Sequence, residues 1–439
     1  MQVPPPQTGT APEPLNRSLG LWDVVAIGIN GVIGTGIFLL PGSVAAMMGP
    51  AALVTYLISA LLCTFVVLCF AEVGSRFRGT GGPMLYTQSA FGELPGFLVG
   101  WFIWLTRITA WGALANGMVA AATALWPAAH DYRVAIIVVL ISALAATNIA
   151  GVSVGARVTN FFTGAKLLPI GIFLAIGLFH IRRDLFTPFS PVGFGEIAPT
   201  TMVILWAFVG FEILTVPAGE MRNPRRSVPR ALVLTMLTVS AVYLLIWAVC
   251  TGTLPTLAGS ENPVAESAIE FLGPRGGALI AFGILLSVLG INAGNALVAP
   301  RALYALAHKG FLPRRLAWVH PGRKTPVVSI LVTSGATLAL ALSGSYIELA
   351  VVSVVARFAQ YIPTCLAVLY FRKKLPDDPP GFRVGGGPIV PVLAVALCFW
   401  LLIESEPRRL LWGFAGLVAG LFIYGIMRFV RTRAQGDPA

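Results

Sequence analysis

Glycines and charged residues inside long apolar segments are the parts of this 439-residue sequence that could do chemistry. Residues 28–38 read Gly-Ile-Asn-Gly-Val-Ile-Gly-Thr-Gly-Ile-Phe, with four glycines in nine residues. Each interior glycine costs a helix roughly 1 kcal/mol relative to alanine, which disfavours an unbroken helix. A break at Gly34, Thr35 and Gly36 would expose backbone N–H groups and the positive end of a half-helix, which suit a carboxylate. The alternative is close helix packing through the same glycines.

A second interruption occurs in a later apolar segment. Residues 205–214 read Leu-Trp-Ala-Phe-Val-Gly-Phe-Glu-Ile-Leu, where a glycine lies close to an acidic residue. Paired interruptions at corresponding positions of two halves are typical of transporters built from inverted repeats, with the binding site near the bilayer midplane. The two segments therefore predict a transporter site formed by two discontinuous helices.

Charged residues within the apolar segments are a further indication of function. Each costs on the order of 2.5–3.5 kcal/mol at the bilayer centre on insertion scales, so each needs a partner or a task. Burial disfavours the charged form of a lysine, which makes Lys166 a candidate proton carrier; the alternative is a static bond to backbone carbonyls of the first span. Glu212 could accept hydrogen bonds, pair with a cation or relay a proton.

Two intramembrane arginines, Arg107 and Arg357, have two open interpretations. They favour an anionic substrate or a second carboxylate if they lie at the site. They could equally pair with Glu212 or Glu348, and the sequence does not choose between these roles.

The elements that would position these residues are membrane spans. The chain is 56% hydrophobic and 11% charged, whereas soluble domains are about a quarter charged. Apolar runs long enough to cross roughly 30 Å of hydrocarbon recur along the chain. They predict an all-α membrane protein of about twelve transmembrane helices, near 22–46, 51–74, 91–125, 134–151, 158–179, 199–219, 229–252, 275–304, 326–343, 347–371, 388–403 and 409–430.

The distribution of basic residues predicts the orientation. With the N-terminus inside, the inner segments hold most of the Lys and Arg, including the clusters at 222–230 and 372–374. The positive-inside rule then puts both termini in the cytoplasm of a multi-pass plasma membrane protein. Because the net charge of +12 is spread over successive loops, we expect no nucleic-acid partner.

Several other classes of function lack a motif. The four histidines show no metal-ligand spacing, no phosphate-binding loop ending in Lys-Ser/Thr is present, and no nucleophile and base stand out together. We therefore expect no metal site, no cofactor, no ATP-driven motor and no enzyme.

Four motifs in order resemble the amino acid/polyamine/organocation (APC) transporter superfamily over most of the chain. They are Gly-Thr-Gly-Ile-Phe at 34–38, Phe-Val-Gly-Phe-Glu at 208–212, the loop 219–230, and residues 305–326 with Ala-Leu-Ala-His-Lys-Gly-Phe-Leu-Pro at their start. The resemblance implies a LeuT-type fold with a 5+5 inverted repeat and discontinuous first and sixth helices. Its transport core would cover 21–371, with repeats at about 21–180 and 198–371. A disordered tail (1–20), a cytoplasmic loop (372–387), two peripheral helices (388–431) and a cytoplasmic tail (432–439) would complete the chain.

The resemblance also implies a substrate site. The substrate carboxylate would meet the free amides of Gly34, Thr35 and Gly36. The amino group would meet carbonyls near Ile33 and around the second break. That break comprises Trp206, Phe208, Val209 and Gly210, and its two aromatic side chains would act as pocket wall or gate.

The coupling ion is suggested by a similarity to proton-coupled relatives, in which a lysine occupies the volume that sodium fills elsewhere. Asn160 and the step to Lys166 resemble that pattern. The sequence thus predicts a secondary active transporter of amino acids or related amines, driven by a proton gradient through Lys166 and Glu212. An exchanger without net proton flux and a non-transporting sensor remain the alternatives. The amino acid, direction, stoichiometry and oligomeric state cannot be read from the sequence.

Overall fold

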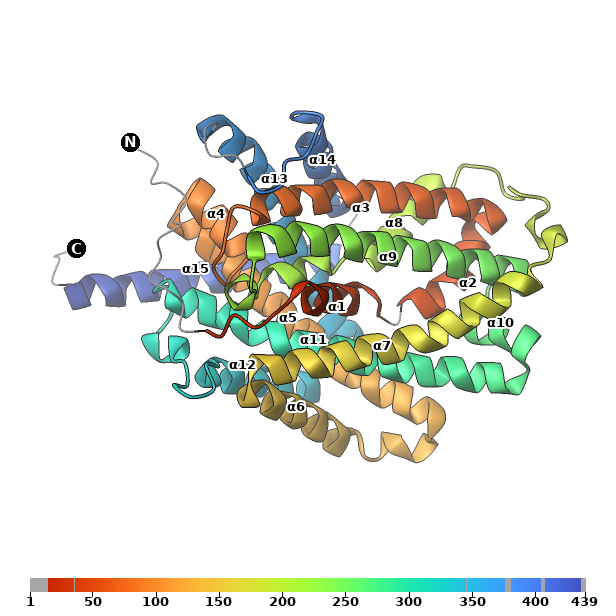
Figure 1. Ribbon diagram of the computed structural model, residues 1–439, viewed down its shortest axis with the longest axis horizontal. Helices are drawn as coiled ribbons and strands as arrows, with labels where there is room; N and C mark the ends of the chain where they lie inside the picture. Colours follow the sequence, from red (N-terminus) through yellow and green to blue (C-terminus); the bar gives the residue numbers. More distant parts are fainter. Residues whose placement is uncertain (1–14, 35, 345, 376–379, 404–406, 436–439) are drawn as a thin grey trace.

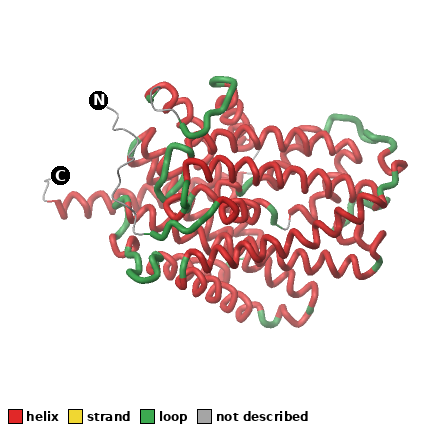
Figure 2. Tube along the Cα trace, in the orientation of Figure 1, coloured by secondary structure: helices red, strands yellow, loops and turns green. Residues whose placement is uncertain are grey.

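A computed structural model describes residues 15–34, 36–344, 346–375, 380–403 and 407–435. This described part is an all-helical bundle without a β-strand, in which long helices run side by side along the longest axis (Figures 1 and 2). Seven helical stretches in it are long and apolar enough to cross a membrane, and three more apolar helices are shorter. The sequence-based assignment to all-α membrane proteins is confirmed.

The helices follow the predicted spans closely. Their bounds are α1 Leu21–Val32, α2 Gly36–Met48, α3 Ala52–Gly74, α4 Pro83–Phe91, α5 Glu93–Leu125, α6 Arg133–Ala150, α7 Val152–Gly177, α8 Ile197–Phe208, α9 Pro224–Thr253, α10 Pro263–Leu272, α11 Pro274–His308, α12 Val327–Ser343, α13 Tyr346–Lys374, α14 Ile389–Ile403 and α15 Pro407–Gln435.

Two short helices were not predicted. Helices α4 and α10 lie in the connections before α5 and α11, and each begins with a proline, which is favoured in the first turn of a helix. Both are too short to span a bilayer, so the search for long apolar runs could not find them. Helix α7 also begins earlier than the predicted start at 158, because Gly151 turns the chain directly out of α6.

The first and sixth spans are both interrupted. The first is divided into α1 and α2, with Ile33 in an extended conformation after α1. The sixth consists of α8, then extended Val209 and left-handed Gly210 (φ 118°), then the 3-10 turns Phe211–Thr215 and Ala218–Glu220. Helix α1 packs against α7, α9, α11 and the turn Phe211–Thr215, so the first break lies inside the bundle.

The end of the expected disordered tail is packed on the bundle. Leu19 is buried and forms a parallel bridge with Met221, donating to the Glu220 carbonyl and accepting from the Arg222 amide. Leu15 is buried too. The backbone of Leu19 therefore ties this end of the tail to the loop after the sixth span, while 1–14 lie outside the described residues.

Candidate functional site

The two helix breaks touch each other through glycines. A β-carbon at Gly31 would lie 2.5 Å from the carbonyl oxygen of Gly210 and 2.6 Å from a methyl group of Ile213. A β-carbon at Gly210 would in turn collide with the carbonyl of Gly31, and the φ of +118° at Gly210 favours glycine as well. Glycine at both positions is what lets the two interrupted backbones come together.

Tyr243 of α9 connects the ends of the two broken helices. Its hydroxyl lies 3.3 Å from the carbonyl oxygen of Val32, at the end of α1, and 3.0 Å from that of Ala207, near the end of α8. The ring packs on buried Phe208 at 5.0 Å between centroids. Because a hydroxyl carries one hydrogen, Tyr243 can donate fully to only one of the two carbonyls at a time.

Lys166 of α7 reaches the first break from the opposite side. It is fully buried, and its Nζ donates to the carbonyl oxygen of Ile33 at 2.8 Å. The Ser287 hydroxyl lies 3.3 Å from the same oxygen and 3.5 Å from the carbonyl oxygen of Gly34. No carboxylate forms an ion pair with Lys166 in the described part of the chain. The bond to a carbonyl of the first span is therefore present, with backbone and not an acid as the partner.

Glu212 is the centre of a buried polar cluster just beyond the second break. One carboxylate oxygen accepts a hydrogen bond from Arg107 of α5. The other accepts from the Tyr361 hydroxyl at 2.6 Å and from the Gly210 amide at 3.1 Å. The Gly210 amide has no helical partner because the helix stops there, so Glu212 satisfies a group that the break leaves free.

Arg357 of α13 makes the cluster positive. Its Nη1 is 3.9 Å from the nearer Glu212 oxygen, beyond hydrogen-bonding distance, and its Nη1 and Nε are buried without a hydrogen-bond partner. Arg107 adds a contact from Nη1 to the Asn295 side-chain oxygen at 3.4 Å. Among the described residues, Glu212 is thus the one carboxylate that Arg107 and Arg357 share, so the cluster has two cations for one anion. The side chain of Glu348 lies outside the described residues.

The remaining predicted site residues can be located only in part. Gly36 begins α2, whereas Thr35 and the side chain of Trp206 lie outside what the structure describes. Val209 borders a small apolar cavity of about 20 Å³ between α3, α8, α13 and α14. Asn160 does not accompany Lys166 but donates to Asp23 of α1 at 2.5 Å.

Three side chains at the site were missed in the sequence. Tyr243, Ser287 and Tyr361 are polar groups inside apolar spans, and such groups are expensive unless they are hydrogen-bonded. Tyr361 also follows Arg357 by one helical turn, which places both on one face of α13. Those signals were available, although they do not name the partners.

Comparison with known proteins identifies the family of this chain. A family model described as amino acid permease matches residues 19–424, which include both breaks and the whole cluster. The chain belongs to the amino acid permease family. The permease accordingly is a multi-pass membrane transporter and not an enzyme, and the fold of its family is LeuT-like.

Curated relatives cover nearly the full length of the permease. The branched-chain amino acid permease BcaP of Bacillus subtilis (strain 168) is 28% identical over 93% of this chain and 92% of its own. The methylthioribose transporter of the same organism is 27% identical, covering 93% of each chain. The serine/threonine exchanger SteT, also of Bacillus subtilis (strain 168), is 31% identical over 88% of this chain and 91% of its own.

Proposed function

We propose that the permease is a secondary active transporter of amino acids that works by alternating access around the two helix breaks. The observation that carries this proposal is the direct contact between Gly31, in the last turn of α1 before the first break, and Gly210 in the second break. Two interrupted helices in contact offer free amides and carbonyls to a zwitterion inside the membrane, where irregular backbone is otherwise too costly. BcaP and SteT, both named as transporters of amino acids, support this substrate class.

In the proposed binding mode the substrate carboxylate meets the amides at the start of α2, at Gly34, Thr35 and Gly36. The substrate ammonium meets carbonyls at the ends of α1 and α8. Two of these carbonyls already accept hydrogen bonds, at Ile33 from Lys166 and at Ala207 from Tyr243. Since a carbonyl oxygen has two lone pairs, the Ala207 carbonyl can accept a further hydrogen bond from the ammonium group, whereas at Ile33 the ammonium would replace the longer contact from Ser287.

Lys166 is the proposed coupling residue. It is a fully buried amine whose only ligand in the described residues is the backbone carbonyl of Ile33, so losing its proton would remove an unpaired charge from the interior. Protonation of Lys166 would strengthen its hydrogen bond to the Ile33 carbonyl at the first break. This would shift the equilibrium between the two access states of the transporter. Glu212 is less suited to carry a proton, because both its oxygens already accept hydrogen bonds. Its proposed role is to hold Arg107 and the second break.

Uptake by the purified permease in proteoliposomes tests these proposals. We expect a panel of labelled amino acids to include substrates whose accumulation rises with an inward proton gradient. Lys166→Ala should abolish this stimulation while leaving counterflow measurable. Ser287→Ala is the matched control, because it removes the other side chain from the Ile33 carbonyl without removing an ionisable group.

The outcomes separate the alternatives. Exchange of internal for external amino acid without any response to pH would establish an exchanger, as SteT is named. Binding without counterflow would establish a sensor. Unchanged gradient-driven uptake by Lys166→Ala would rule out the coupling role of Lys166. Stimulation of uptake by sodium alone would contradict the proposal that Lys166 takes the place of sodium. Localisation to the plasma membrane with both termini in the cytoplasm completes the proposal.

A further inference from the structure

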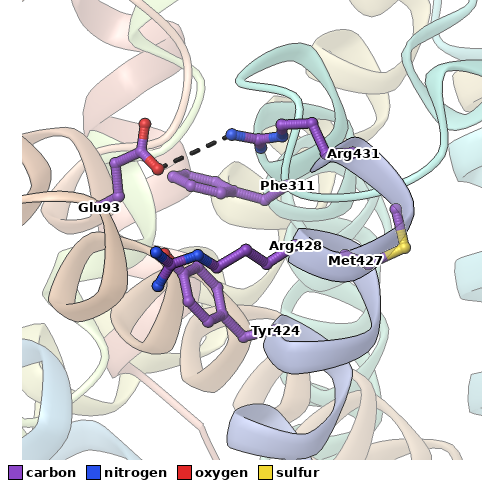
Figure 3. A pocket seen from close by; sticks show the side chains of 6 residues that line it. All are labelled: Glu93, Phe311, Tyr424, Met427, Arg428 and Arg431. Atoms are coloured by element: carbon purple, nitrogen blue, oxygen red, sulfur yellow. Dashed lines mark ion pairs between the residues drawn. The ribbon is translucent and has the colours of Figure 1, made fainter. Parts of the chain in front are cut away.

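A cavity far from the helix breaks lies between the start of α5, the turn after α11 and the end of α15. Its volume is about 300 Å³, and it is lined by Glu93, Phe311, Tyr424, Met427, Arg428 and Arg431 (Figure 3). The four lining residues from α15 stand at positions i, i+3, i+4 and i+7, so they form one stripe on that helix. The transport mechanism uses none of these side chains.

The floor and one wall of the cavity are fixed by packing. Phe97, Phe311 and Tyr424 form an aromatic cluster, with Tyr424 5.2 Å from Phe97 and 6.5 Å from Phe311 between ring centroids. Arg431 donates to the carbonyl of Gly310 at 2.5 Å and lies 3.7 Å from a carboxylate oxygen of Glu93. Arg431 is therefore held in place, and Glu93 neutralises at most one of the two arginines.

Arg428 is the group that this packing leaves available. It is exposed, and within the described residues it has no acidic partner and no hydrogen bond. Figure 3 shows its guanidinium beside the Tyr424 ring, with the Phe311 ring between it and the guanidinium of Arg431 in this view. The two arginines and one glutamate give the site one positive charge in excess, which suits an anion with several acceptor oxygens.

The position of the cavity identifies the source of that anion. Residues 410–431 form an apolar span, and only 11% of its most apolar window is buried inside the bundle, so the face of α15 that does not pack on α5 and α13 is available to lipid. Phe422, Phe429 and Val430 are more than half exposed on its other faces. Arg428 and Arg431 lie at the C-terminal end of this apolar span, where lipid headgroups are expected, and basic pockets between spans on the cytoplasmic side suit such groups.

We propose that this cavity binds the phosphate of an anionic phospholipid, with Arg428 as the principal ligand and Arg431 as its prearranged neighbour. The acyl chains lie along the exposed apolar face of α15. By the predicted orientation, the lipid belongs to the cytoplasmic leaflet.

Native mass spectrometry of the full-length permease in detergent tests this site. Phosphatidylglycerol and phosphatidylcholine with identical acyl chains are titrated into wild type, R428Q and the control R78Q, which removes an exposed arginine outside the cavity. We expect wild type to retain phosphatidylglycerol over phosphatidylcholine. R428Q should weaken that retention by at least about fivefold, and R78Q by less than about twofold.

Three results would overturn the proposal. Equal losses in R428Q and R78Q would mean that only general surface charge attracts the lipid. Unchanged retention in R428Q would exclude Arg428 as a ligand. Displacement of the lipid by millimolar inorganic phosphate would identify a site for soluble anions instead of a membrane lipid.

Discussion

Replacing Glu212 with glutamine perturbs the buried cluster without changing its volume. The glutamine oxygen can still accept from Tyr361 or the Gly210 amide, but its amide group must face another donor, the guanidinium of Arg107. Removing one partner of a buried ion pair typically costs about 3–5 kcal/mol, because the other charge stays buried without compensation. The cost should lie at the upper end of that range, since Arg357, 3.9 Å from the Glu212 carboxylate, loses its ion pair as well.

Thermal unfolding of the detergent-purified protein measures this cost. We expect E212Q to unfold at least about 5 °C below wild type. Glu261→Gln is the control, because Glu261 is exposed and such surface changes alter stability by less than about 0.5 kcal/mol. R107Q should be destabilising alone, and the double variant R107Q/E212Q should lose roughly 1–3 kcal/mol less than the sum of the two single losses.

The double-mutant cycle provides the decisive result. Strictly additive losses would show that Arg107 and Glu212 do not interact. An unfolding temperature for E212Q equal to that of wild type would refute the assignment of Glu212 as the anion that compensates this cluster.

Three further perturbations test the site and its surroundings. Gly31→Ala should destabilise the protein by about 1–3 kcal/mol and stop uptake, because its β-carbon would meet the opposite break, whereas Gly164→Ala, with open space beside it, should change neither. Arg301→Gln should lower the free energy of unfolding by about 3–5 kcal/mol, because fully buried Glu220, now paired with Arg301 at 2.8 Å, would lose its cation. Adding Glu220→Gln should restore part of the lost free energy of unfolding. A further decrease in the double variant would count against pairing of the two residues. Tyr243→Phe should slow uptake while costing only about 1 kcal/mol of stability; unaltered uptake would show that the shared hydroxyl is dispensable.

Local sequence determined the membrane class, most spans and both interruptions. Hydrophobic run length is a property of consecutive residues, and the bilayer thickness converts it directly into a helix. Both breaks also follow from the local sequence. Gly34 and Gly36 weaken the continuity of an α-helix, and Gly210 adopts a left-handed conformation that other residues avoid. The short helices α4 and α10 were not predictable in this way, because neither crosses the membrane.

The tertiary structure alone decided which residues meet. Arg107 and Glu212 are 105 positions apart, and Tyr243 reaches Val32 across 211 positions, so their pairing depends on how α5, α9 and α1 pack. The cost of burying a charge predicted that each intramembrane residue needs a partner, yet several partners satisfied that requirement equally well in the sequence. Only the packed bundle selected the Ile33 carbonyl for Lys166 and Glu212 for Arg107, and left Arg357 with buried donors still unpaired.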